Sequence, residues 1–367
     1  MKKLKLKKKN TFIAIIVLLF IIIELINPSR LIDLSKLNKH GYSKEASREI
    51  IKKGLKKEAL NNEYSEFIDL NISANAFEKE NYAFYQKIDY NAKIDMSIVN
   101  RLKEIGYQEK EVSLILNRGD KESINSLLTK DKYNNISEYL NFSYAKLSLL
   151  DRYIDYYLKN STSYSEAVVY VNIGLDQEFY TNTKEVKEFS VTMLVNKYNA
   201  LSSTFVPNDL VKFSEEYCKG TCPEAYSKAV EAFSDMAKAI KTEKGLSIYA
   251  NSAYRSYAYQ EETYNSLTKQ YGQNYNVAKP GYSEHQTGLA VDISSGSSKT
   301  FKGSQEEKWL NDNSYKYGFI KRYDSKKTTI TGYDEPWHYR YVGKDIAKDI
   351  YEKKITFDEY YVKFLER

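Results

Sequence analysis

Apolar and polar residues follow two different patterns along this chain, one before and one after about residue 160. Between residues 30 and 160, Leu and Ile recur at helical spacing among Lys and Glu, and the stretch contains no Pro. After residue 165, short apolar runs typical of strands are interspersed with helical patterns at irregular intervals. The chain therefore predicts a helical region followed by an α+β domain over residues 165–367.

The helical region contains a weak internal repeat with an offset of 65 residues. Residues 37–54 match residues 102–119 without a gap, and each copy carries a Gly-Tyr pair, beginning at Gly41 and at Gly106. Each copy predicts a helix, a turn and a second helix ended by glycine. In this register His40 is a turn residue. A longer single helix is predicted over residues 137–159, and residues 28–160 are interpreted as a helical stalk.

The second region has a sequence of predicted strands and helices. A polar linker at residues 160–163 precedes it. Strands are expected at residues 168–173, 246–250, 288–293, 319–320 and 337–342, with a short extended piece at 194–198. Helices are expected from Pro223 to Gly245, from Ser256 to about Lys269, from Ser304 to Gly318, and after Gly343 and Thr356.

The amino terminus has the pattern of an export signal. Six of its first nine residues are lysines, and an apolar run from Phe12 to Ile26 follows, broken only by Glu24. No small-residue cleavage pattern follows the run, so an uncleaved signal anchor is favoured over a cleaved peptide. The positive-inside rule then makes residues 1–10 a cytoplasmic tail, residues 11–27 a single transmembrane span, and the rest extracytoplasmic. The predicted location is the cell membrane.

Charge and cysteine content exclude several classes of function. The net charge is +6, and the six lysines of the tail account for it, so the remainder offers no basic surface for nucleic acid. Two cysteines cannot form a Cys-only zinc cluster. Cys218 and Cys222 lie close together in a turn, and outside the cell a small disulfide loop is favoured over free thiols.

Two of the three histidines lie beside carboxylates in a pattern suited to a metal. His285 precedes Asp292 by seven residues, and Glu335 precedes His338 by three. Two nitrogens and one carboxylate oxygen leave a fourth position open, which is the ligand count of a catalytic zinc site. Glu335 is then placed to act as general base on a zinc-bound water. The alternative is that the histidines are hydrogen-bonded core residues and that Asp292 lies at a sheet edge.

These segments resemble the zinc motifs of VanY-type D-alanyl-D-alanine carboxypeptidases, within the lysostaphin/D-Ala-D-Ala peptidase/hedgehog-like metallopeptidases. The resemblance rests on residues 252–260, 283–292 and 335–341 and extends over about residues 165–367. It implies a small central antiparallel sheet flanked by helices, and one zinc ion per chain. It also implies roles for seven residues: His285, Asp292 and His338 as zinc ligands, Glu335 as catalytic base, Arg255 at the substrate and the oxyanion, and Gln260 and Ser283 as substrate contacts.

The resemblance implies removal of the C-terminal D-alanine from peptidoglycan stem peptides, and both D,D- and L,D-specificity remain open. A fixed guanidinium at Arg255 suits a terminal carboxylate and an oxyanion, although a structural ion pair is the alternative. Lys279 stands where the family pattern has arginine, away from the proposed ligands. A non-catalytic wall-binding or sensory module and a cross-link endopeptidase are the rival functions. The oligomeric state and the partner of residues 30–160 stay open.

Overall fold

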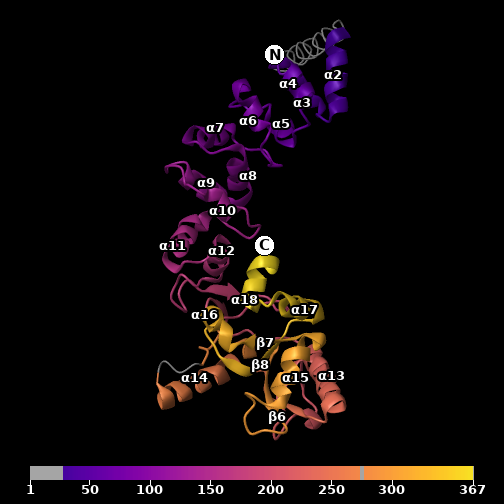
Figure 1. Ribbon diagram of the computed structural model, residues 1–367, viewed down its shortest axis with the longest axis vertical. Coiled ribbons are helices and arrows are strands. Elements are labelled where there is room, and N and C mark those ends of the chain that lie inside the picture. Colours follow the sequence, from indigo (N-terminus) through magenta and orange to yellow (C-terminus); the bar gives the residue numbers. More distant parts are fainter. Residues whose placement is uncertain (1–27, 273–276, 367) are drawn as a thin grey trace, which may run out of the picture. The chain divides into compact units, whose positions relative to one another are not determined.

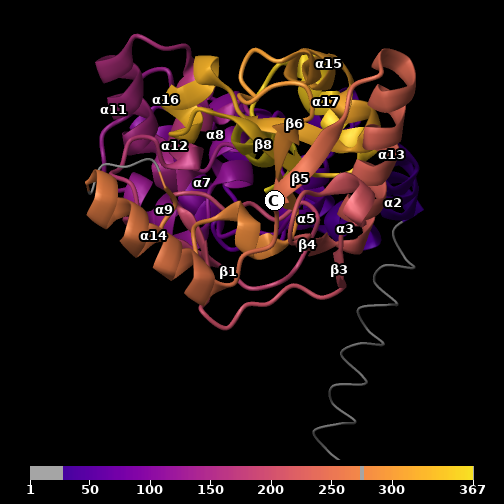
Figure 2. The same ribbon diagram turned by 90° about the horizontal axis from the view of Figure 1, so that it is seen from below.

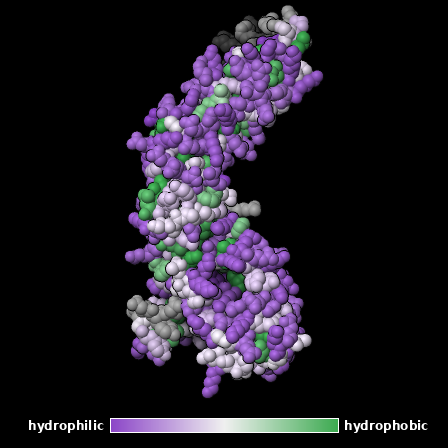
Figure 3. All heavy atoms as spheres, viewed as in Figure 1, coloured by the Kyte–Doolittle hydropathy of each residue, from purple (hydrophilic) through white to green (hydrophobic). Residues whose placement is uncertain are grey.

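The computed structural model describes residues 28–272 and 277–366 (Figure 1). The predicted cytoplasmic tail and signal anchor lie outside these ranges. Within them, no helix combines the length and the apolar composition that crossing a membrane would require. The chain divides into two compact units, Met1–Leu150 and Asp151–Arg367. On the face shown in Figure 3, hydrophilic residues dominate the surface of each unit, and small apolar patches are scattered among them.

The first unit is helical in its described part. Its elements are α2 (Pro28–His40), α3 (Lys44–Lys52), α4 (Lys56–Asn61), α5 (Glu66–Asn71), η1 (Lys79–Asn81), α6 (Tyr82–Tyr85), α7 (Met96–Ile105), α8 (Glu109–Arg118), α9 (Lys121–Leu127), α10 (Ile136–Leu140) and η2 (Leu147–Leu149). Both copies of the sequence repeat form a helix, a turn and a helix. Gly41 and Gly106 adopt φ values of 117° and 104° at the turns, a conformation that glycine adopts without steric cost. The tyrosines that follow them, Tyr42 and Tyr107, are buried.

A further helix–turn–helix begins at the boundary of the two units, where the sequence predicted other elements. It consists of α11 (Leu150–Asn160) and α12 (Tyr164–Ile173), with Ser161 at φ 49° where the earlier copies have glycine. The predicted strand at 168–173 is therefore wrong. Ser163 and Glu166 form a capping box that starts a helix, and apolar residues on several faces of α12 conceal the helical period. The single helix predicted over 137–159 is also wrong, because a turn at Asn141–Ala145 separates α10 from η2 and α11.

The second unit is built around a four-stranded antiparallel sheet. Its strands are β5 (Ile248–Ser252), β6 (Ala290–Ser295), β8 (Glu335–Tyr341) and β7 (Phe319–Tyr323), in that spatial order. They confirm the strands predicted in these four segments and the small antiparallel sheet. The predicted extended piece at 194–198 forms no regular strand. Instead, Asn196 makes an isolated bridge with Asn199.

Two smaller sheets and several helices surround the central sheet. The paired strands are β1 (Lys184–Val186) with β2 (Asn199–Leu201), and β3 (Leu210–Lys212) with β4 (Glu224–Tyr226). The α-helices are α13 (Ser227–Lys244), α14 (Tyr257–Tyr271), α15 (Gln305–Asn313), α16 (Thr328–Thr331), α17 (Lys344–Lys353) and α18 (Phe357–Tyr360). Short 3-10 helices are η3 (Glu215–Tyr217), η4 (Glu284–Thr287), η5 (Ser314–Tyr317) and η6 (Ser325–Lys327), and η7 (Tyr361–Leu365) is a π-helix. In both ribbon views α13 and α14 lie on opposite sides of the central sheet (Figures 1 and 2).

The main core of this unit lies between α13, α15 and the sheet. Phe233 and Ile240 of α13 pack with Val291 of β6 and Tyr339 of β8, and all four side chains are almost completely buried. Ser256 and Ser304 cap α14 and α15 as predicted. The helix expected from Pro223 starts only at Ser227, because residues 224–226 form β4. This core holds β6 and β8 side by side, and both strands carry residues of the predicted site.

The two cysteines form a disulfide, as the sequence predicted. Cys218 and Cys222 are bonded, with their Cα atoms 5.4 Å apart. The backbone of Cys218 also bridges Ala250 of β5. The disulfide loop is therefore attached directly to the edge of the central sheet.

Candidate active site

All seven residues singled out in the sequence line one cleft in the second unit. The cleft has a volume of about 170 Å³. The seven residues are Arg255, Gln260, Ser283, His285, Asp292, Glu335 and His338, from the segment after β5, α14, the residue before η4, η4 itself, β6 and β8. Residues more than 80 positions apart in the sequence thus meet in one cavity.

Strand register brings Asp292 and His338 together. Asp292 of β6 lies directly opposite His338 of β8 in the antiparallel ladder. Side chains of directly opposed residues lie on the same face of a sheet, so the carboxylate and the imidazole are neighbours. His285 comes from η4, where the Ser283 hydroxyl accepts a hydrogen bond from the His285 backbone N–H (3.4 Å). Gly288, at φ 70°, ends this turn and returns the chain to β6.

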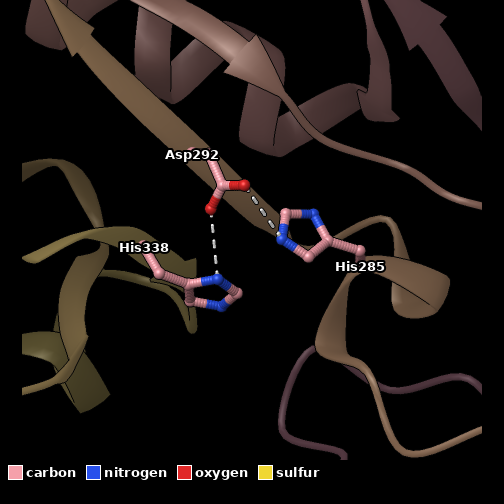
Figure 4. A group of neighbouring side chains, drawn as sticks. All are labelled: His285, Asp292 and His338. Atoms are coloured by element: carbon pink, nitrogen blue, oxygen red, sulfur yellow. Dashed lines mark ion pairs between the residues drawn. The ribbon is translucent and has the colours of Figure 1, made fainter. Parts of the chain in front are cut away.

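Figure 4 shows that the three side chains converge on one point. Asp292 Oδ2 is 3.3 Å from His285 Nε2, and Asp292 Oδ1 is 3.2 Å from His338 Nδ1. The three candidate ligand atoms all lie within 4.8 Å of one another. Asp292 Oδ1 and His338 Nδ1 are buried, and neither has a hydrogen-bond partner among the described residues. Buried polar atoms without partners are costly, so this convergence fits a cation bound between them.

One ring nitrogen of each imidazole is hydrogen-bonded to a neighbour, so the other ring nitrogen faces the proposed metal position. His285 Nδ1 donates to the carbonyl oxygen of Ala253 (2.6 Å), which leaves Nε2 as the ligand atom. His338 Nε2 donates to Glu284 Oε2 (3.2 Å), which leaves Nδ1. Such partners orient metal-binding histidines in many proteins. The donor set therefore fits zinc, with two nitrogens and one oxygen available.

Burial and charge set the protonation of these groups. Burial and the nearby Arg255 guanidinium lower the pKa of His285 to about 4, so its imidazole is neutral at physiological pH. Burial of Asp292 opposes ionisation, but His285 and His338 outweigh it and hold the pKa of the carboxyl well below its usual range. Burial raises the pKa of Glu335, whose Oε2 lies 3.6 Å from His338 Nδ1. A carboxylate with a raised pKa beside the ligand atoms is suited to proton transfer.

Three predicted substrate-contacting residues lie around this group. The backbone N–H of Arg255 donates to the carbonyl of His285 (3.2 Å), and its buried Nε has no hydrogen-bond partner among the described residues. Gln260 Nε2 donates to the carbonyl of Ala278 (2.8 Å), whereas its buried Oε1 has no such partner. Ser283 lines the cleft and caps η4. Arg255 and Gln260 therefore keep polar atoms available in the cleft.

Glu284 was not predicted from the sequence, and it is the centre of a buried charge network. Its side chain is fully buried, and its Oε1 is 2.9 Å from Arg322 Nε and 3.2 Å from Arg340 Nη1. Arg322 also contacts Asp358 of α18 (2.7 Å), which in turn accepts a hydrogen bond from Asn196 (2.8 Å). The two cations outweigh the effect of burial and hold the pKa of Glu284 well below its usual range. The available sequence signal is weak: Arg322 and Arg340 each stand between aromatic or other polar residues in a short strand.

Lys197 is a second residue that the sequence did not reveal. Its ammonium lies 4.0 Å from the centre of the Phe179 ring and 4.2 Å from that of Tyr333, and it donates to the carbonyl of Gly332 (3.1 Å). Burial lowers the pKa of Lys197 to about 8. Tyr333 lines the cleft, and Glu335 follows two residues later. Lys197 thus fixes the turn that leads into the segment carrying Glu335.

The fold and the donor set of this site fit the class of metal-dependent hydrolases. The sequence model described as "VanY: D-alanyl-D-alanine carboxypeptidase" matches residues 224–344, which include every predicted site residue. The chain is 37% identical over 227 residues to the putative carboxypeptidase YodJ of Bacillus subtilis, covering 56% of this chain and 80% of that protein. It is 52% identical over 85 residues to a D-alanyl-D-alanine carboxypeptidase of Enterococcus faecalis, covering 23% of this chain and 31% of the relative.

Two solved structures are also similar to the chain. A structure of the LdcB LD-carboxypeptidase has a TM-score of 0.47 and 38% identity, covering 51% of this chain and 92% of that one. A structure of VanYB in complex with D-alanine-D-alanine has a TM-score of 0.40 and 33% identity, covering 46% of this chain and 96% of that one. The extent of the match to YodJ places the chain in a family: it belongs to the VanY family of D-alanyl-D-alanine carboxypeptidases. It is a hydrolase of the carboxypeptidase type, and zinc is the cofactor indicated by the family and the donor set.

Proposed function

We propose that the protein is a zinc-dependent carboxypeptidase that removes D-alanine from the C-terminal end of peptidoglycan stem peptides. The observation that carries the proposal is the convergence of His285, Asp292 and His338, with two buried ligand atoms that make no hydrogen bond to any described residue. A bound zinc ion would lower the pKa of a water molecule to about 7 and polarise the scissile carbonyl. Names of relatives that include D-alanyl-D-alanine carboxypeptidases support the substrate class.

Glu335 has the location and the pKa direction of the proton carrier in this reaction. Its carboxylate adjoins the ligand group, and burial raises its pKa toward the range in which a carboxyl both accepts and donates protons. In the proposed reaction Glu335 takes the proton of the attacking water and returns it to the amine of the departing D-alanine. This transfer needs no other proton carrier in the cleft.

Arg255 has the charge required at the other end of the substrate. A carboxypeptidase must bind a terminal carboxylate, and guanidinium binds carboxylates with two parallel hydrogen bonds. The buried Nε of Arg255 is available for such a bond. In the proposed complex Arg255 binds the terminal carboxylate and contributes positive charge near the developing oxyanion. Gln260 is the proposed second polar contact to the substrate, and Ser283 contributes by capping η4.

We also propose that the protein is anchored in the cell membrane with this domain outside the cell. The support comes from the sequence: a lysine-rich start, an apolar run and the absence of a cleavage pattern after it. The disulfide between Cys218 and Cys222 is consistent with an oxidising compartment. Fractionation of cells, followed by protease treatment from outside, tests the location independently of the activity.

The activity is tested by incubating the purified protein with zinc and two stem peptides, one ending in D-Ala-D-Ala and one ending in a single D-alanine. We expect free D-alanine from at least one of them, and the preferred peptide assigns D,D- or L,D-specificity. Release from neither peptide contradicts the proposal. If cross-linked peptides are cut while both linear peptides remain intact, the enzyme is an endopeptidase. Metal analysis should give about one zinc ion per chain and much less in His338→Ala.

A further inference from the structure

We propose that a groove next to the active-site cleft binds a carboxylate-bearing segment of the substrate upstream of the terminal residues, through Lys219 and Lys299. This inference rests on the proposed function, because it assigns the binding of the rest of the same peptide. The groove has a volume of about 570 Å³. Its walls carry the two lysines, Trp337 and the serines of residues 294–298. Its lining also includes the apolar side chains Ile293 and Phe301.

The groove adjoins the cleft at Trp337. This residue precedes the proposed ligand His338, lines both the cleft and the groove, and keeps 41% of its surface exposed. An exposed tryptophan is a suitable contact for a peptide backbone or a sugar ring, because it offers a large rigid apolar surface. A substrate that leaves the cleft past Trp337 therefore reaches the groove.

Strand register places the groove and Arg255 at opposite ends of the proposed ligand group. Ile248 of β5 pairs with Ser295 of β6, and Ser252 pairs with Asp292, so β5 runs from the Ser295 end of β6 toward Asp292. Arg255 follows β5 and lies beyond Asp292, whereas the groove lies at the opposite end, near Ser295. A peptide whose terminal carboxylate binds Arg255 thus directs its upstream residues toward the groove. The three-residue step from Asp292 to Ser295 along β6 spans about 10 Å, which is the length of a short extended peptide segment.

The charge of the groove indicates the chemistry of its ligand. Lys219 and Lys299 are both exposed, and every residue lining the groove is described and none is acidic. The Lys219 ammonium lies over the ring of Tyr249, 4.3 Å from its centre, and this contact restricts the side chain. A nearby lysine that does not line the groove, Lys302, is neutralised by Asp334 (3.0 Å). The two unneutralised lysines therefore favour a carboxylate.

Both lysines stand on segments that are fixed before a ligand binds. The loop after β6 is held by buried Glu306, which accepts hydrogen bonds from the Ser297 hydroxyl (2.8 Å) and backbone N–H (3.0 Å). Lys219 lies inside the disulfide loop, whose first cysteine bridges β5. Pre-ordered groups lose less conformational entropy on binding. The disulfide thus has a role in the proposed groove, because it holds Lys219 at the groove wall.

The test uses two peptides that both end in D-Ala-D-Ala and differ in one upstream residue, which is Glu in one and Gln in the other. A set with this residue at two, three and four positions before the scissile bond covers the distance to the groove. The unaltered enzyme should have a kcat/KM roughly fivefold higher for the Glu peptide at one position, as expected for two exposed charge pairs. Lys219→Glu/Lys299→Glu should abolish or invert that preference. Zinc content and kcat/KM for a short N-acyl-D-Ala-D-Ala should not change.

Lys302→Glu is the control, since it reverses one charge outside the groove, in the loop that also carries Lys299. Cleavage of all peptides with equal kcat/KM would overturn the groove while leaving the proposed function intact. The groove would also be overturned if the double variant still preferred the Glu peptide. The same holds if Lys302→Glu removed this preference as fully as the double variant does. A double variant that loses activity only on intact cell walls would likewise overturn it in favour of an anionic wall polymer. Absence of D-alanine release by the unaltered enzyme from every peptide would instead refute the proposed function.

Discussion

The imidazole of His338 donates through Nε2 to the carboxylate of Glu284, 3.2 Å away, and presents Nδ1 to the proposed metal position. Glu284 precedes another proposed ligand, His285, so adjacent residues of η4 serve the same site in two ways. His285 supplies a nitrogen, and Glu284 fixes the orientation of the second histidine. Because Glu284 is held by Arg322 and Arg340, the orientation of His338 depends on a rigid buried network.

Replacing Glu284 with glutamine should therefore weaken zinc binding. The amide keeps the shape but loses the negative charge that holds the His338 N–H, and losses of such partners usually cost 10- to 100-fold in metal affinity. Chelator competition against the apoprotein measures this without any assay of activity. Glu306→Gln is the control, because Glu306 is also buried but contacts Ser297. Equal zinc affinities for Glu284→Gln and the unaltered protein would contradict the positioning role of Glu284.

Asp358 extends the same network to α18 near the carboxyl terminus. Both of its oxygens contact Arg322, and both side chains are almost completely buried. Asp358→Asn leaves the Arg322 charge only partly compensated, so we expect the free energy of unfolding to fall by about 3–5 kcal/mol. Urea denaturation measures the change. Asp349→Asn, which breaks a more exposed pair with Lys353, should lower the free energy of unfolding much less. If Asp358→Asn lowers the free energy of unfolding as little as Asp349→Asn does, the buried network adds little stability.

The three residues predicted as metal ligands converge in the structure, whereas the sequence did not indicate the residues that support them, for a physical reason. His285, Asp292 and His338 stand out because imidazole and carboxylate side chains are unusual next to buried strands. Glu284 lies in the same motif, but its partners come from β7 and β8, and only the folded register brings them together. Local patterns contain no information on such long-range pairs.

The difference between local sequence patterns and long-range contacts also explains which elements of the fold were predicted. The strand at 288–293 was predicted because its apolar residues are bounded by turn residues, and the structure has β6 there. The similar run at 168–173 is instead α12, since burial around several faces of a helix gives the same apolar composition as a buried strand. The capping box of Ser163 and Glu166 was the available signal for a helix.

Lys197 should make the stability of the protein depend on pH in a defined window. Burial lowers the pKa of Lys197 to about 8, from 10.5 for an ordinary lysine. Between these values the unfolded chain holds a proton on Lys197 that the folded chain has released, so this residue makes the free energy of unfolding rise with pH. Urea denaturation from pH 7 to 11 should show this rise in the unaltered protein relative to Lys197→Met. Parallel curves for the two proteins would contradict it.

Glu335→Gln should separate the chemistry of the cleft from its structure. Glutamine has nearly the same shape but cannot carry the proton from water to the leaving amine, so we expect kcat to fall by roughly 10²- to 10⁴-fold. Zinc content and the midpoint of unfolding should remain close to those of the unaltered protein, because Glu335 is not among the proposed ligands. Asp292→Asn is the contrasting variant, and it should lose both zinc and activity. A Glu335→Gln enzyme that keeps kcat within a few-fold would exclude Glu335 as the proton carrier and leave the zinc site unaffected.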